Sequence, residues 1–228
     1  MYHVFTIQTS VWVIATLSFI CFLGGYIIAP PEGPWQHVRL AFSAIGTTAT
    51  IIALAGTQFV FDWIWRVPIV QKFMFPYING KWSGTITSNW ATISAAHRIS
   101  TPNVNPALSE EGKEASPQQT EKRVNVEIQA NLFSATMTLM PEDRYSESIS
   151  VSLIPVESKE LEKPRLYYIY KSSVKNPQLS DEQESYGAAF LEIIQNKNRD
   201  ILEGNYWTNR KWKEGLNTAG MISLNRMR

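Results

Sequence analysis

The residues best suited to chemistry lie in the run Gly204-Asn205-Tyr206-Trp207-Thr208-Asn209-Arg210. Successive side chains of an extended strand alternate between two faces, so Tyr206, Thr208 and Arg210 are predicted to share one face. A ring, a hydroxyl and a guanidinium suit a ligand with a nucleobase and a phosphate, because aromatics stack on bases and arginine binds phosphate oxygens bidentately. Tyr168 and Tyr170 offer a second aromatic face. These five residues are the candidate ligand-binding residues.

A structural role for Arg210 is the competing interpretation. Small calycin-like barrels begin with Gly-x-Trp and close one end by stacking a late arginine on that tryptophan. Gly80-Lys81-Trp82 is such a start, and either Arg210 or Arg226 could be the closing arginine. The sequence leaves both roles open for Arg210.

Patterns typical of an enzyme are absent from the sequence. The three histidines, His3, His37 and His97, are scattered, and the single cysteine, Cys21, lies in an apolar run. They form neither a metal-ligand spacing nor a disulfide framework. Nucleophile elbows, phosphate loops and dinucleotide fingerprints are also missing. We therefore expect no enzymatic activity, no metal site and no cofactor.

The charge balance limits the class of ligand. With 21 basic and 20 acidic side chains the formal net charge is +1. A protein that binds a DNA or RNA polymer normally shows a strong basic excess. The composition therefore excludes a broad nucleic-acid surface and leaves small anionic ligands open.

The elements that carry these residues follow an apolar N-terminal segment. Only Glu32 and Arg39 are charged among the first 61 residues. Two uncharged runs, about 4–28 and 40–61, are each long enough to cross a hydrocarbon core of ~30 Å. Prolines in the link between them turn the chain. The sequence predicts a two-helix transmembrane hairpin over 1–66, an uncleaved anchor in the lipid bilayer.

The basic residues that flank the hairpin indicate its orientation. Arg39 in the link is outnumbered by Arg66, Lys72 and Lys81 after the second helix. Because cytoplasmic loops carry the excess of lysine and arginine, both termini and the following domain are predicted to be cytoplasmic.

Small residues form one face of the second predicted helix. Gly46, Ala49, Ala53 and Gly56 recur every three to four residues. Such residues allow close helix packing in lipid. Two interpretations stay open: packing against the first helix, or self-association of chains into a homo-oligomer.

After a connector at 67–77 the pattern changes to period two. Hydroxyl and aliphatic residues alternate from Ser148 to Leu153, as expected for a half-buried strand. Eight such strands with short links favour an antiparallel meander, and eight strands can close a small barrel that holds one ligand. The strands are predicted at 81–90, 124–129, 132–140, 148–153, 165–171, 186–194, 200–210 and 218–226. The predicted fold is membrane-anchored and all-β, with an N-terminal two-helix transmembrane hairpin, then a small eight-stranded antiparallel β-barrel over 78–228 and a mobile loop at 99–120.

The order of these features resembles a known family. The two N-terminal helices, the Gly80-Lys81-Trp82-Ser83-Gly84-Thr85 start, the Tyr206-Trp207-Thr208-Asn209-Arg210 strand and the closing Gly220-Met221-Ile222-Ser223-Leu224 are similar to the two-transmembrane β-barrel effectors of bacterial CBASS antiphage defence. The resemblance covers essentially the whole chain.

This resemblance implies a function. In that family a CD-NTase-type nucleotidyltransferase makes a cyclic oligonucleotide after phage infection. For this chain the resemblance favours a cyclic dinucleotide as the ligand. The cytoplasmic barrel would bind it, and the effector would oligomerise and disrupt the bacterial inner membrane, killing the cell. Two alternatives are a membrane-tethered lipocalin-like barrel that binds a lipid or other apolar ligand, and a membrane scaffold that binds a protein partner.

Overall fold

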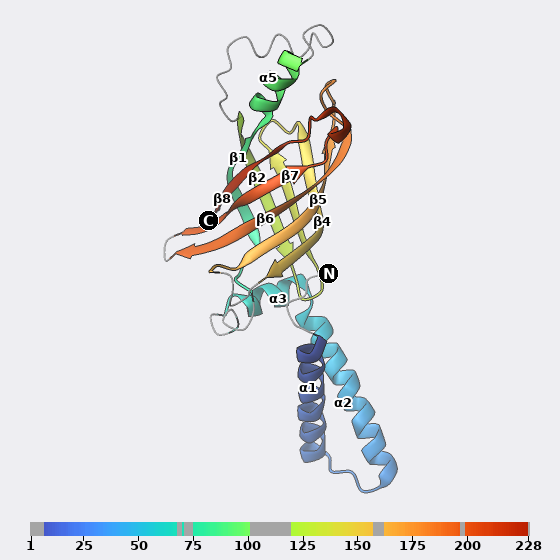
Figure 1. Cartoon of the computed structure of the whole chain (residues 1–228). Helices are drawn as coiled ribbons and strands as arrows, with labels where there is room; N and C mark the ends of the chain where they lie inside the picture. The colour runs from blue at the N-terminus through green and yellow to red at the C-terminus, as the bar shows by residue number, and fades with distance from the viewer. Residues whose placement is uncertain are drawn as a thin grey trace. The chain divides into compact units, whose positions relative to one another are not determined.

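The computed structural model describes residues 7–67, 70, 75–100, 120–156, 162–196 and 199–227. These residues form two compact units, a helical unit and a β-barrel unit. The predicted fold class is confirmed, because the structure contains a closed eight-stranded antiparallel barrel and two apolar N-terminal helices long enough to cross a membrane (Figure 1). Most of the predicted mobile loop, at 101–119, and most of the connector lie outside the described residues.

The helical unit contains α1 (Ile7–Ile28), α2 (Pro34–Ala55) and α3 (Gln58–Trp65). The second helix begins six residues before the predicted start, because Pro34 lies in its first turn, where a missing N–H costs nothing. It also ends earlier than predicted. Gly56 caps α2, and Thr57 starts α3 from an extended conformation, so the predicted run 40–61 is divided between two helices.

The two long helices pack through one side of α2. A Cβ atom on Gly25 of α1 would lie 2.6 Å from Leu40 Cδ1, so the helices approach closely there. Ala44 and Thr48, one and two turns further along α2, are buried.

Three of the four small residues lie on a different side of α2. Gly46, Ala49 and Ala53 are exposed, whereas Gly56 is buried at the end of the helix. At 3.6 residues per turn, the three exposed positions lie roughly opposite Ala44 and Thr48. Packing against α1 therefore does not account for these three.

The barrel is a meander in which each strand pairs with its neighbour in the chain, and β8 returns to pair with β1. The β1–β8 pairing runs from Trp82 opposite Arg226 to Ser88 opposite Gly220. All eight predicted strands are present, with shifted ends. The strands are β1 Gly80–Ser88, β2 Thr120–Ala130, β3 Ala135–Pro141, β4 Ser146–Val156, β5 Arg165–Val174, β6 Glu184–Asn196, β7 Arg199–Thr208 and β8 Ala219–Arg226.

Apolar side chains fill one end of the barrel, at the start of β1. On β2, Val124, Val126 and Ile128 are buried and alternate with exposed polar residues, as the period-two pattern predicts. Trp82 of β1 and Leu224 of β8 are also buried. This solid core leaves the opposite end, where β1 finishes, as the place for a cavity.

A helix that the sequence analysis did not predict follows β1. This helix, α5 (Trp90–Ser100), lies at the end of the barrel where β1 finishes (Figure 1). Asn89 fixes its start, because its N–H donates to the Ala219 carbonyl at 3.0 Å and its Oδ1 accepts from the Ala219 N–H at 2.9 Å. The barrel therefore sets the position of the first turn of α5.

Candidate functional site

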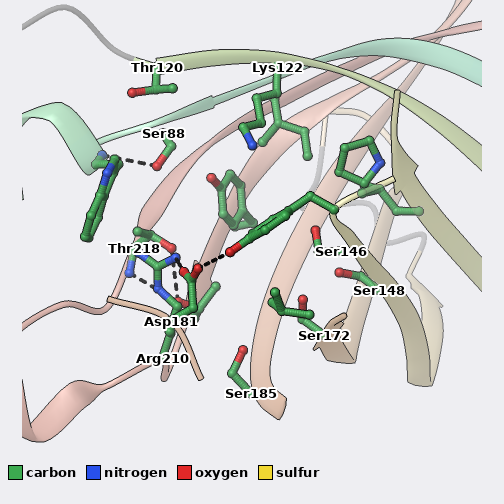
Figure 2. Close-up of a pocket in the computed structure, with 18 of the residues that line it drawn as sticks. Ser88, Thr120, Lys122, Ser146, Ser148, Ser172, Asp181, Ser185, Arg210 and Thr218 are labelled. Atoms are coloured by element: carbon green, nitrogen blue, oxygen red, sulfur yellow. Dashed lines mark hydrogen bonds and ion pairs between the residues drawn. The ribbon is translucent and has the colours of Figure 1, made fainter. Parts of the chain in front are cut away.

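The barrel holds a cavity of about 1080 Å³ at the end where β1 finishes. Its volume is at the upper end of the range for small-molecule sites. Tyr168, Tyr170, Tyr206, Thr208 and Arg210 all line it, so the structure brings the five candidate ligand-binding residues together. Figure 2 shows the hydroxyls and charged groups of its wall.

Hydroxyl side chains dominate the polar lining. Ser148, Ser172 and Ser185 lie directly opposite one another on β4, β5 and β6, and form a row across three strands. Outside the barrel, Ile149 and Val151 are 47% and 65% exposed. The alternation on β4 was predicted, but Ser146 and Ser148 line the cavity while Ile149 and Val151 face solvent. A bulge between Ser150 and Ser152 then reverses the two faces, and Leu153 is buried. The closed barrel, rather than the alternation itself, determines which of these residues face the cavity.

The tyrosines of β5 form the deep wall. Tyr168 and Tyr170 are buried, with ring centroids 5.8 Å apart. Burial raises the pKa of both hydroxyls above the ordinary value near 10, so both stay protonated even in alkaline solution where an exposed tyrosine ionises. Gly187 makes room for this arrangement, because a Cβ atom there would lie 2.3 Å from Tyr170 Cζ. Burial also raises the pKa of Tyr206, whose hydroxyl bonds to Ser88.

Thr208 and Arg210 reach the cavity in different ways. Thr208 ends β7, and its hydroxyl lies 3.1 Å from that of Thr218, which also lines the cavity. Arg210 lies beyond the strand end, in the β7–β8 turn, rather than on β7 as predicted. Asn209 holds this turn, because its N–H donates to the Tyr186 carbonyl at 2.8 Å and its Oδ1 accepts from the Tyr186 N–H at 2.7 Å.

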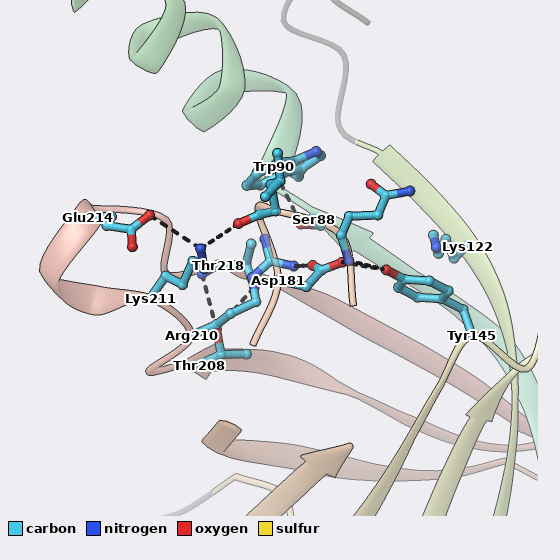
Figure 3. A network of polar contacts seen from close by, with 12 residues as sticks. Ser88, Trp90, Lys122, Tyr145, Asp181, Thr208, Arg210, Lys211, Glu214 and Thr218 are labelled. Atoms are coloured by element: carbon cyan, nitrogen blue, oxygen red, sulfur yellow. Dashed lines mark hydrogen bonds and ion pairs between the residues drawn. The ribbon is translucent and has the colours of Figure 1, made fainter. Parts of the chain in front are cut away.

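The Arg210 guanidinium belongs to a network at the cavity wall (Figure 3). Its Nη1 donates to Asp181 Oδ1 at 2.8 Å, and its Cζ lies 4.7 Å from the centre of the Trp90 ring of α5. Asp181 Oδ2 accepts from the Tyr145 hydroxyl and from the Gln178 N–H. Burial and then the bond to Asp181 raise the pKa of Tyr145, so its hydroxyl remains a donor.

Sequence reasoning missed three members of this network. Trp90 was taken as the end of a strand, while Asp181 and Tyr145 lie in turns between strands, where no periodicity marks them. The only available signal was the Ala91-Thr92-Ile93-Ser94-Ala95-Ala96 stretch after Asn89, a capping residue followed by helix-compatible residues.

Arg226, rather than Arg210, is the arginine that closes the barrel end. Its guanidinium lies 4.6 Å from the Trp82 ring centre and 4.9 Å from that of Tyr77. It also donates to the carbonyls of Asn79 and Tyr77 and pairs with Asp200 at 2.9 Å. The structure therefore assigns the plug, which the sequence had left open between two arginines.

A second ion pair lies at the cavity. Lys122 Nζ is 3.1 Å from Asp143 Oδ2, and both side chains are about half exposed. The Tyr145 N–H and then Lys122 lower the pKa of Asp143. Among the described lining residues, Lys122 and Arg210 balance Asp143 and Asp181. The described residues contain no cluster of potential metal ligands. The wall is thus suited to binding a polar ligand through hydroxyls, rings and two cations.

Comparisons with known proteins agree with this geometry. Residues 73–226 match the model of a family described as Cap15, cyclic dinucleotide receptor domain. The matched segment contains every strand of the barrel and the whole described cavity wall. The chain is also similar to CD-NTase-associated protein 15 of Escherichia albertii, with 28% identity over 220 residues that cover 96% of this chain and 92% of that protein.

Proposed function

The chain belongs to the family of Cap15 cyclic dinucleotide receptor domains, and we propose that its barrel cavity is the receptor site for a cyclic oligonucleotide, with a cyclic dinucleotide as the favoured ligand. The observation that carries this proposal is the cavity wall. It combines ten serine and threonine side chains with the buried tyrosines and with Arg210. Hydroxyls suit ribose and base edges, rings suit bases, and a guanidinium suits a phosphodiester.

The proposal extends to an antiphage effector that acts at the bacterial inner membrane. A CD-NTase-type nucleotidyltransferase would supply the ligand, which agrees with the name of the E. albertii relative. The barrel and both termini would be cytoplasmic, with α1 and α2 spanning the lipid bilayer. Ligand binding would promote homo-oligomerisation, and the assembled hairpins would disrupt the membrane and kill the cell.

The small-residue face of α2 supports the self-association step. Gly46, Ala49 and Ala53 are exposed on α2, on a side that α1 leaves open. Close packing of small residues is a main source of helix association in lipid, where the hydrophobic effect does not act between helices. This face is where a second copy could pack.

Calorimetry on the full chain in detergent micelles tests the receptor proposal. The probes are cyclic di-AMP, cyclic di-GMP, cyclic GMP–AMP and cyclic UMP–AMP. We expect at least one to bind, and Arg210→Ala to weaken that binding by about ten-fold or more, because a charge-assisted contact to phosphate is lost. Glu184→Gln, on the outer surface, is the matched control. If none of these four cyclic dinucleotides binds the wild-type chain, the proposal that the cavity receives a cyclic dinucleotide is wrong.

A lipocalin-like function is the second candidate. Ile86, Met137, Leu139 and Ile222 give the cavity an apolar portion that a lipid could contact. This alternative predicts that the purified chain retains a lipid inside the barrel. Native mass spectrometry distinguishes the lipocalin-like function from the receptor function. If the barrel is a lipid carrier, a retained lipid should be displaced by other lipids and not by cyclic dinucleotides. If it is a receptor, cyclic dinucleotides should displace the lipid.

A further inference from the structure

Asp181 places a negative charge in the wall of the proposed receptor cavity. Its side chain is only 7% exposed. Three donors hold it: Arg210 Nη1 at 2.8 Å, the Gln178 N–H at 3.2 Å and the Tyr145 hydroxyl. All three contacts are made to the carboxylate oxygens of Asp181. The cavity therefore contains an internal anion attached to the same guanidinium that would bind a phosphate.

Two nitrogens of the Arg210 guanidinium are not used by Asp181. The Nε and Nη2 of Arg210 have no hydrogen-bond partner among the described residues and are closed off from solvent, so a ligand reaches them only when the guanidinium turns away from Asp181 and towards the cavity. The Trp90 ring lies against the guanidinium, 4.7 Å from its carbon, and limits its orientation. An arginine can form two parallel hydrogen bonds with an anion. Asp181 accepts only one N–H of Arg210. The guanidinium is therefore held in one orientation, but its other N–H groups form no hydrogen bond with Asp181 (Figure 3).

The charged residues of the cavity wall are paired, so a bound anion meets carboxylates as well as cations. The described lining holds two cations and two carboxylates, in the pairs Arg210–Asp181 and Lys122–Asp143. A cyclic dinucleotide brings two ionised phosphodiesters into this balanced site. A phosphodiester that reaches the free donors of Arg210 comes close to the carboxylate on the same guanidinium, where like charges repel strongly because little water screens them.

We propose that Asp181 sets the affinity and the anion selectivity of the cavity by competing with the ligand's phosphodiester for Arg210. The inference rests on the proposed receptor function. A ligand that offers one weak anionic contact gains no more from Arg210 than Asp181 already provides. A phosphodiester that engages Nε and Nη2 together makes contacts that Asp181 does not make. Asp181 therefore raises the ligand concentration needed for binding and excludes weaker anions.

The test compares charge-neutral variants of the full chain in detergent micelles by calorimetry, with the four cyclic dinucleotides named above. Asp181→Asn keeps the shape and one acceptor for Arg210 but removes the charge. We expect it to bind the preferred cyclic dinucleotide about ten-fold more tightly than the wild type, the scale of one close like-charge interaction. Glu184→Gln, which neutralises an exposed carboxylate paired with Lys171 outside the cavity, should change the affinity by less than about two-fold.

A double-mutant cycle separates competition from a general charge effect. In an Arg210→Ala background, Asp181→Asn should change the affinity by less than about three-fold, because the contested group is absent. Circular dichroism checks that each variant folds, and Asp181→Ser replaces Asp181→Asn if the latter does not. Unchanged or weaker binding by the neutral variant, with a wild type that binds, would overturn the inference alone. Absence of binding by both proteins would overturn the receptor function as well.

Discussion

Two arginines of the barrel have opposite surroundings. Arg226 contacts two rings, two backbone carbonyls and the carboxylate of Asp200. Arg210 has one ring, one carboxylate and two buried nitrogens with no hydrogen-bond partner among the described residues. A side chain whose hydrogen bonds are used within the fold is suited to stabilise it. One with spare donors in a cavity wall is suited to bind a ligand.

Substitution should separate these two roles. Arg226→Met is expected to lower the free energy of unfolding by about 3 kcal/mol, because it leaves partly buried Asp200 and two carbonyls without their donor. Arg210→Met should cost less stability, since Asp181 keeps the Tyr145 and Gln178 donors. Urea unfolding followed by circular dichroism measures both changes. Equal losses for the two variants would contradict this assignment.

At the scale of elements, the strands were predictable because each one carries its own signal. The alternation of Val124, Val126 and Ile128 is enough to locate β2, since a period of two in a short window is a local property. The sequence pattern does not show which side of each strand faces the barrel interior. The alternation on β4 shows the period, but only the closed barrel decides that Ser148 faces inwards and Val151 outwards.

The candidate site was predictable where it lies on strands and, for Arg210, just beyond the end of one. Tyr168, Tyr170, Tyr206 and Thr208 share a cavity because neighbouring strands bring inward positions together. Asp181 reaches Arg210 across 29 residues of chain through two turns, and turns carry no periodicity that reveals where their side chains meet. The division of the second helix at Gly56 was likewise hidden by its continuous apolar composition.

The tyrosine wall of β5 should make the barrel sensitive to alkali. Burial raises the pKa of Tyr168 and Tyr170 above the ordinary value near 10, so the folded chain keeps protons that the unfolded chain releases. Stability is therefore unaffected below about pH 9 and falls as pH rises through 10. Two such groups give a slope of about 2.7 kcal/mol per pH unit. Tyr206 adds to it, because its pKa is also raised.

Urea unfolding between pH 8 and 11.5 measures that slope. Tyr168→Phe removes one of the titrating hydroxyls and should reduce the slope by about 1.4 kcal/mol per pH unit. Tyr186, which is 49% exposed on β6, is a suitable position for a control Tyr→Phe substitution. A stability that stays constant up to pH 11.5 would show that the two tyrosines are not buried in solution.

At the scale of the whole molecule, the cavity and the small-residue face lie in different units. The cavity is inside the barrel, and Gly46, Ala49 and Ala53 lie on α2. A ligand can drive assembly only if it binds the assembled form more tightly than the resting form. The proposed function therefore requires that ligand binding and self-association be linked but separable by mutation.

A larger side chain on the small-residue face should uncouple self-association from ligand binding. Ala49→Leu in the full chain is expected to leave ligand affinity within about two-fold of the wild type, because Ala49 is in the helical unit. It should greatly reduce ligand-induced oligomers, since a larger side chain prevents close helix packing. Thr47→Leu is the matched control, because Thr47 is also exposed on α2 but projects more than a quarter turn away from each of the three small residues. Cross-linking in liposomes with and without ligand measures the oligomers, and dye release measures membrane damage. If Ala49→Leu assembles and releases dye as the wild type does, another surface must mediate self-association.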